Sequence, residues 1–170
     1  PMGHSIDAMC YCIGEFRNVS ATFGTLLTEV TNIDTGEVLR DRTSEDRIAF
    51  TGTLENGAVV DVHYRGGVSR ATNFLWEING SEGDLRITAD SGHAQMFELT
   101  LVGGRGDDKT LSPLPIPAEH RWIPADIQAL GVNVGQMYAR MAKDIREGTR
   151  SAPSFADAVT KAYRALCEFR

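Results

Sequence analysis

Two alternating segments joined by Asn56-Gly57 limit the fold of this chain more than any other feature of its sequence. In residues 48–54 every second side chain is large and apolar except at Gly52, and the side chains between them are Ala49, Thr51 and Thr53. In residues 58–65 the apolar side is Val60, Val62 and Tyr64, and the other side is Val59, Asp61, His63 and Arg65. A period of two is typical of a half-buried strand, and Asn-Gly is the strongest short signal for a hairpin turn. Strands joined by so short a turn run antiparallel. We therefore expect the chain to be built around an antiparallel sheet.

Other segments with strand character lie on both sides of this hairpin. They are residues 16–27, 73–79, 84–88 and 96–102, with turns at Asp34-Thr35-Gly36 and at Gly80-Ser81-Glu82-Gly83. Helical patterns flank the strands instead of alternating with them, which favours α+β over βαβ units. The sequence predicts an α+β fold with an open, mostly antiparallel sheet of about six strands and helices packed on one face.

Three helices are predicted. Residues 5–13 have an apolar face, with Ser5 as the N-cap and Gly14 as the C-terminal stop. A second helix is predicted from Pro124, with Asp126 in its first turn, to Gly148, and a third is predicted to open at Ser154. The apolar stripe of the second helix is Val134, Met137, Tyr138, Met141 and Ile145, and the expected buried face of the third is Phe155, Val159, Ala162, Tyr163 and Leu166.

Composition excludes several classes of protein. The 170 residues carry a net charge of −6, which gives no electrostatic reason to bind nucleic acid or an anionic membrane surface. The sequence has no apolar run of the roughly 18 residues that span a bilayer, and no signal peptide opens it. The 3 cysteines lack the spacing of a disulfide framework, so we expect free thiols and a cytoplasmic protein.

Motifs for cofactors and metals are missing from the sequence. The glycine-rich run 103–106 leads into an acidic, proline-rich loop instead of a helix N-terminus, so we expect no nucleotide there. The four histidines have no metal-ligand spacing. No cofactor-binding and no metal-binding residue is predicted.

His4 and Asp7 are the candidate catalytic residues. On a helix, positions three apart share a face, so the carboxylate lies near the imidazole. Such a pair can accept a proton from a hydroxyl group near neutral pH. Local capping by His4 and a favourable dipole interaction of Asp7 are the structural alternative.

A mixed polar face is predicted on the far side of the hairpin. It contains Asp61, His63 and Arg65 with Thr51, Thr53 and Glu77. Such a face is either solvated or used for contact with a partner. We expect it to pair two copies of the chain.

Five segments in order resemble the Gfo/Idh/MocA oxidoreductase family. They are residues 3–15, 52–58, 76–85, 133–148 and 153–158. Residues 1–4 and 53–67 are most similar to the branch that contains the galactose-pathway repressor of yeast and its enzyme-like relatives. The resemblance covers nearly the whole chain.

The resemblance implies a protein of two domains with different functions. An N-terminal Rossmann domain would bind NAD or NADP, and residues 1–170 would form the C-terminal substrate and dimerisation domain. His4 matches the family's active-site histidine, and Asp7 matches the acid one turn later. Because the chain starts with Pro1 and opens directly on a helix, we expect the Rossmann domain to be missing from it.

Two functions follow from the resemblance. The first is the C-terminal domain of an NAD(P)-dependent oxidoreductase acting on a sugar or polyol hydroxyl, inactive alone. The second is a non-catalytic sensor or transcriptional regulator that uses this domain for binding and dimerisation. Expected partners are a small sugar or polyol, the Rossmann domain and a second copy of the chain.

Overall fold

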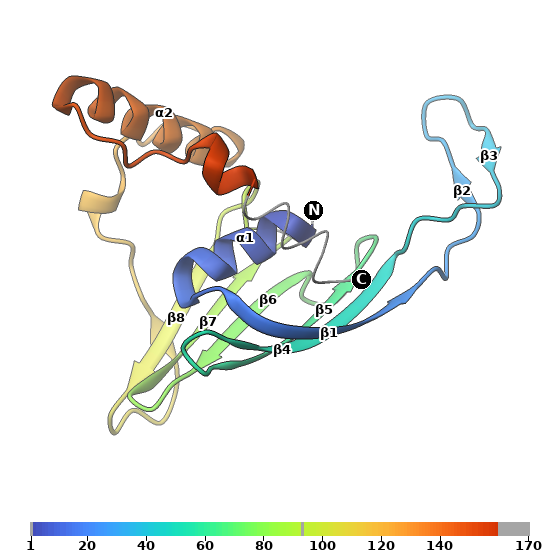
Figure 1. Cartoon of the computed structure of the whole chain (residues 1–170), viewed down its shortest axis with the longest axis horizontal. Helices are drawn as coiled ribbons and strands as arrows, with labels where there is room; N and C mark the ends of the chain where they lie inside the picture. The colour runs from blue at the N-terminus through green and yellow to red at the C-terminus, as the bar shows by residue number, and fades with distance from the viewer. Residues whose placement is uncertain (1, 93, 160–170) are drawn as a thin grey trace. The chain divides into compact units, whose positions relative to one another are not determined.

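The computed structural model describes residues 2–92 and 94–159. It has an α+β fold with open antiparallel sheets, which confirms the predicted fold class (Figure 1). The strands belong to three hydrogen-bonded sheets, of three, two and four strands, a division that the sequence did not predict. Residues 6–67 form the body of one compact unit, and residues 68–158 form the body of the other.

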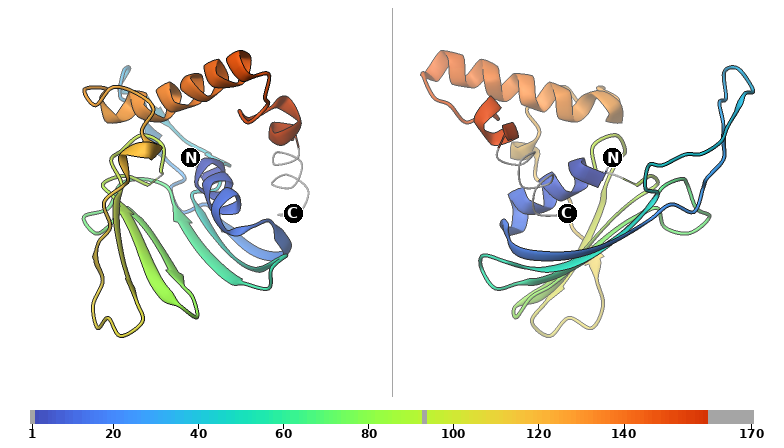
Figure 2. Two further views of the ribbon diagram at one scale, coloured as in Figure 1. Left: turned by 90° about the vertical axis from the view of Figure 1, so that its left-hand side faces the viewer. Right: turned by 45° about the vertical axis from the view of Figure 1, so that its right-hand side comes forward.

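The first unit is a helix on a three-stranded sheet. It contains most of α1 (Met2–Ile13), and its sheet has the order β1 (Phe16–Gly24), β4 (Arg47–Leu54), β5 (Val59–Arg65). The helix lies over one face of this sheet (Figure 2). The core between them consists of Met9, Cys10, Phe16, Phe50 and Leu54.

The Glu55-Asn56-Gly57 turn joins β4 to β5, as the sequence predicts. The N–H of Gly57 donates to the Leu54 carbonyl at 3.0 Å, and the N–H of Leu54 donates to the Ala58 carbonyl at 2.8 Å. Gly57 has a φ of 91°, a backbone conformation that glycine adopts without steric cost. This is a three-residue hairpin loop closed by glycine.

A long excursion between β1 and β4 carries a small ribbon at its end. The ribbon pairs β2 (Val30–Thr31) with β3 (Val38–Leu39), and Figure 1 shows it projecting beyond the three-stranded sheet. Gly36, with a φ of 72°, completes the predicted turn at the tip, where its N–H donates to the Asn32 carbonyl at 2.9 Å. We call residues 25–46 the arm.

The second unit has a four-stranded antiparallel sheet followed by a helix. Its strands lie in the order β6 (Phe74–Asn79), β7 (Gly83–Ala89), β8 (Thr100–Arg105) and β9 (Ser112–Pro113). A 3-10 turn, η1 (Ala118–His120), and the helix α2 (Ala129–Glu147) complete it. The first half of α2 is held by side chains: Asn133 donates to the Gln95 carbonyl at 2.7 Å, and Gln136 donates to the His120 carbonyl at 2.6 Å.

Several predicted boundaries were wrong. Helix α1 begins at Met2, so Ser5 lies inside it and is not its N-cap. Strand β8 starts at Thr100 and continues to Arg105, whereas a strand over residues 96–102 was expected. Helix α2 begins at Ala129, because Pro124 opens a turn instead: its carbonyl accepts the N–H of Ile127 at 3.4 Å.

The helix stops were predicted correctly. Gly14 follows α1 and donates to the Cys10 carbonyl at 3.0 Å. Gly148 ends α2 in the left-handed conformation with a φ of 68°. Ser154 opens the next helical segment, where its hydroxyl accepts the N–H of Asp157 at 3.3 Å.

The apolar faces of the C-terminal helices are more exposed than the sequence predicts. All five stripe residues of α2 are at least 39% exposed, and Ile145 reaches 76%. Phe155 and Val159 are exposed by 93% and 66%, although a buried face was expected. Ala162, Tyr163 and Leu166 lie outside the described residues. The periodicity of apolar residues in the sequence indicates that a helix has an apolar side, but it does not indicate which other part of the protein covers that side.

Candidate functional site

Helix α1 carries both candidate catalytic residues. His4 and Asp7 lie three positions apart on it, and both are exposed. Met9 and Cys10 are the buried side of the same helix, with 6% and 8% exposure. Helix geometry therefore places an imidazole and a carboxylate on one accessible face.

Tyr11 is a further polar residue of α1 that the sequence analysis missed. It follows Asp7 by four positions, one helical turn, and is 73% exposed. His4, Asp7 and Tyr11 have the i, i+3, i+7 spacing of a helix stripe. The same periodicity that located the buried face would have identified this stripe on the opposite face.

The end of α1 is fastened to the β4–β5 turn. The side-chain amide of Asn56 donates to the Ile13 carbonyl at 2.8 Å, and its oxygen accepts the N–H of Ala58 at 3.0 Å. The N–H of Glu55 donates to the Glu15 carbonyl at 2.9 Å. The last carbonyls of a helix lack partners within the helix, so Asn56 satisfies one of them. The hairpin turn thereby fixes the helix that presents His4 and Asp7.

The polar face of the three-stranded sheet was predicted in part. Asp61, His63 and Arg65 are all exposed and alternate with half-buried residues on β5. Asp61 lies opposite Thr51 in the antiparallel register. Glu77 does not belong to this face, because it lies on β6 of the four-stranded sheet.

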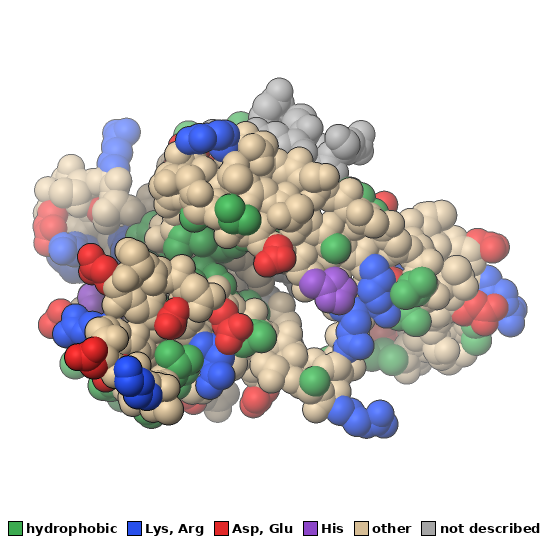
Figure 3. All heavy atoms as spheres, turned by 90° about the horizontal axis from the view of Figure 1, so that it is seen from below, with side chains coloured by type: hydrophobic (Ala, Val, Ile, Leu, Met, Phe, Trp, Pro, Cys, Tyr) green, Lys and Arg blue, Asp and Glu red, His purple; other side chains and the backbone are tan. Residues whose placement is uncertain are grey.

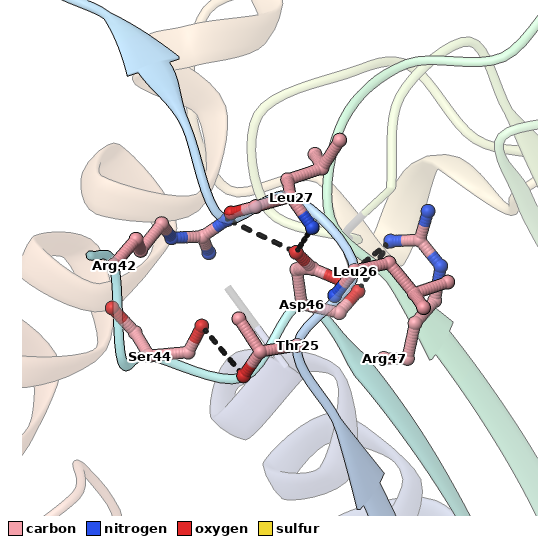
Figure 4. A network of polar contacts seen from close by, with 7 residues as sticks. All are labelled: Thr25, Leu26, Leu27, Arg42, Ser44, Asp46 and Arg47. Carbon is pink, nitrogen blue, oxygen red and sulfur yellow. Dashed lines mark hydrogen bonds and ion pairs between the residues drawn. The ribbon is translucent and has the colours of Figure 1, made fainter. Parts of the chain in front are cut away.

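A buried carboxylate at the base of the arm was also missed. Asp46 is 1% exposed, and its two oxygens accept the N–H groups of Leu26 at 3.1 Å and Leu27 at 2.7 Å (Figure 4). Arg42 and Arg47 bind the same carboxylate at 3.1 and 3.0 Å. Burial alone would raise the pKa of Asp46, but these hydrogen bonds and cations outweigh it and lower the pKa.

A second buried carboxylate organises the chain after α2. Asp144 accepts hydrogen bonds from the Thr149 hydroxyl at 2.7 Å and from the N–H groups of Ser151 and Ala152 at 2.8 and 2.7 Å. The Thr149 hydroxyl and these N–H groups lower the pKa of Asp144. Both buried acids act on loop geometry, not on the face of α1.

The glycines near β8 have a packing role. A side chain at Gly103 would meet Leu114 at 2.7 Å and Leu85 at 2.8 Å.

Among residues 2–92 and 94–159, no group of three or more His, Cys, Asp or Glu side chains is arranged to hold a metal ion. Within the same residues no helix has the length and apolar character to cross a membrane.

Solved structures with the same fold come from oxidoreductases and from a regulator. The super-repressor mutant of Gal80p from Saccharomyces cerevisiae matches 99% of this chain with a TM-score of 0.79 and 21% identity. Levoglucosan dehydrogenase in complex with NADH and levoglucosan matches 98% with a TM-score of 0.74 and 23% identity. The chain covers 45% of each of these proteins. The fold is that of the C-terminal domain of Gfo/Idh/MocA-type proteins.

Sequence comparison gives the family more narrowly. A family profile described as "Gal80p, C-terminal domain" matches residues 1–89, and the chain belongs to this family. The galactose/lactose metabolism regulatory proteins GAL80 of Kluyveromyces lactis and S. cerevisiae are 32% and 33% identical over 108 and 121 residues. These matches cover 58% and 65% of this chain but 24% and 28% of the two relatives.

Proposed function

We propose that residues 1–170 are the C-terminal substrate and dimerisation domain of a cytoplasmic NAD(P)-dependent oxidoreductase that acts on a sugar or polyol hydroxyl. The observation that carries this proposal is the exposed His4–Asp7 pair on α1. A fold shared with levoglucosan dehydrogenase supports it. Since the chain covers less than half of that enzyme, we expect this domain to be inactive alone.

In this proposal His4 accepts the proton of the substrate hydroxyl. Asp7, one turn further along α1, orients the imidazole and stabilises its charged form. The chain has no dinucleotide fingerprint, so its own residues would not hold the cofactor. A nicotinamide bound by the rest of the protein would accept the hydride from the substrate carbon. The hydrogen bond from the Asn56 side chain to the Ile13 carbonyl, which we call the Asn56 clamp, would hold α1 and with it His4 and Asp7 in position.

The test is turnover by the full-length protein. Reduction of NAD or NADP is followed at a panel of sugars and polyols, including levoglucosan. For an active substrate, His4→Ala should lower kcat/KM by about 10²–10⁴-fold, the usual contribution of a general base. Asp7→Asn should lower it less. His120→Ala, an exposed histidine on η1, is the matched control. Unchanged turnover in His4→Ala would refute the role of His4.

A non-catalytic regulator is the second candidate. The observation that favours it is that both sequence relatives above 30% identity are regulatory proteins. In that case the full-length protein would bind NAD or NADP, measured by calorimetry, without reducing it at any sugar. Steady turnover that depends on His4 would exclude this candidate.

We further propose that two copies pair through the open face of the three-stranded sheet. Asp61, His63 and Arg65 project from this face beside Thr51. Thr51→Lys would place a long cation in the middle of the face and should weaken the dimer in sedimentation. An unchanged dimer in this variant would contradict pairing through the sheet.

A further inference from the structure

Helix α1 carries a small residue and an aromatic residue beside the proposed catalytic pair. Ala8 follows His4 by four positions and precedes Tyr11 by three, so these side chains share one face of the helix with Asp7. The buried core residues of α1 lie on its opposite side. Ala8 is half-buried, whereas Tyr11 is 73% exposed. The accessible face of α1 therefore extends one helical turn beyond Asp7.

The spacing along the helix sets the size of a group that fits between His4 and Tyr11. Each residue adds about 1.5 Å along the axis, so the two Cα atoms are separated by roughly 10 Å in that direction. Helix side chains lean toward the N-terminus, which brings the phenol ring of Tyr11 nearer to His4. Between them the helix presents the methyl group of Ala8, a short side chain that leaves room for a bound ring.

The chemistry of this face fits a sugar in its ring form. A sugar ring has hydroxyl groups around its edge and apolar C–H groups on its faces. Tyrosine presents a large apolar ring with a polar tip, and ordering its two side-chain torsions costs little entropy. Small-molecule sites are typically lined by apolar and aromatic side chains, with a few polar groups that fix the orientation. On α1 the aromatic ring is that of Tyr11, and the polar groups are those of His4 and Asp7.

The order of the side chains distinguishes this helix face from a mixed surface. On the face of the molecule that Figure 3 shows, acidic and basic side chains are interspersed, with apolar side chains among them. On α1, by contrast, an imidazole, a carboxylate, a methyl group and a phenol ring follow one another along a single helix. A helix holds such groups at fixed separations, which is what a binding site requires.

We propose that Tyr11 and Ala8 are specificity-determining residues of the oxidoreductase. The substrate ring lies over Ala8, with its C–H face against the phenol ring of Tyr11 and one hydroxyl group at His4. This proposal rests on the function proposed above. Ring sugars are then preferred over open-chain polyols, because a flexible chain offers no flat apolar face and loses more conformational entropy when it is ordered.

The test compares substrates of matched composition in the full-length protein. Reduction of NAD or NADP is followed with the ring sugars glucose, xylose and levoglucosan, and with the open-chain polyols sorbitol and xylitol. Tyr11→Ala should raise KM for the ring sugars by about tenfold, the change that a lost contact of 1.4 kcal/mol produces. It should leave kcat unchanged, because the contact is the same in the ground state and the transition state.

Three further variants separate a substrate contact from a structural role. Tyr11→Phe keeps the aromatic ring and should restore the KM that Tyr11→Ala loses. Ala8→Leu keeps a strong helix former but fills the space above the helix, so it should also raise KM for the ring sugars. Tyr138→Ala, which removes a tyrosine that is 57% exposed on α2, is the matched control. An unchanged KM in both Tyr11→Ala and Ala8→Leu would overturn the proposal.

Failure of this proposal can be distinguished from failure of the proposed function. If turnover depends on His4 but KM does not depend on Tyr11 or Ala8, the proposal on specificity fails and the oxidoreductase stands. In the absence of turnover, binding of the same sugars is measured by calorimetry with NADH present. Binding that Tyr11→Ala weakens would refute the oxidoreductase and keep the Tyr11 contact, whereas no binding of any sugar would overturn both.

Discussion

Removing the Asn56 side chain should loosen α1 from the sheet without disturbing the core. In Asn56→Ala the Ile13 carbonyl loses its side-chain donor, and the N–H of Ala58 loses its acceptor. Gly57, the residue that needs the left-handed conformation, stays in place. The hairpin should therefore still form, and the main effect should fall on the attachment of the helix.

The size of the effect follows from these two hydrogen bonds. Each typically contributes about 0.5–1.5 kcal/mol to stability. Because Asn56 is exposed, water replaces part of what is lost, and we expect a total loss of about 1–2 kcal/mol. For a protein of this size that lowers the melting temperature by about 3–6 °C. Asn56→Asp keeps the acceptor for Ala58 but places an oxygen against the Ile13 carbonyl, so it should lose about 1 kcal/mol.

Two measurements check this reasoning. Thermal unfolding gives the total loss, and hydrogen exchange shows where it falls. The amide of Gly14, which donates to the Cys10 carbonyl, should exchange faster in both Asn56 variants. Asn79→Ala removes an exposed hydrogen bond to Asp84 in the other unit and is the control. If Asn56→Asp has the melting temperature of the wild type and the Gly14 amide exchanges no faster, the hydrogen bond from Asn56 to the Ile13 carbonyl does not stabilise the attachment of α1, which would refute this prediction.

Three further substitutions test other parts of the fold. Gly52→Ala places a methyl group against the backbone oxygen of Asn18 on the neighbouring strand. Urea titration should therefore show that the free energy of unfolding falls by about 2–3 kcal/mol. An unchanged free energy of unfolding would contradict the close approach of the two strands at Gly52. Gly148→Ala should cost about 1 kcal/mol, because φ is 68° there; an unchanged melting temperature would contradict this. The pKa of Asp46 is lowered from the ordinary value of 3.8, so the ionised carboxylate stabilises the fold at any pH above 3.8. This stabilisation is lost as the pH falls below 3.8 and the carboxylate takes up a proton. Asp46→Asn should therefore be less stable at neutral pH and lose less stability on acidification, and parallel pH profiles would show that Asp46 is not the titrating group.

Much of the fold could be predicted from local patterns. Alternation located β4 and β5, and the Asn-Gly signal located the turn between them. Glycines marked the ends of both helices. These features depend on a few consecutive residues and on backbone conformations that only some residues adopt. The start of α2 was predicted wrongly because proline suits a turn as well as a first helical turn.

The candidate site could be predicted only where its residues share one helix. His4 and Asp7 could be proposed as a pair because helical spacing places them on one face, and their catalytic role stays a prediction. The contact of Asn56 with α1 and the buried carboxylate of Asp46 were missed, although the structure gives both residues several hydrogen bonds. Asn56 reaches a carbonyl 43 residues away, and Asp46 reaches N–H groups 19 and 20 residues away. No local pattern reports contacts over such separations.

The sequence by itself determined the antiparallel hairpin, the helix stops and the shared helix face of His4 and Asp7, because each depends on the periodicity or the backbone freedom of neighbouring residues. Only the tertiary structure decided that the strands belong to three sheets, that the hairpin turn clamps α1, and that a buried Asp46 closes the base of the arm. The physical reason is that burial of a carboxylate and satisfaction of a helix carbonyl depend on which distant segments pack together.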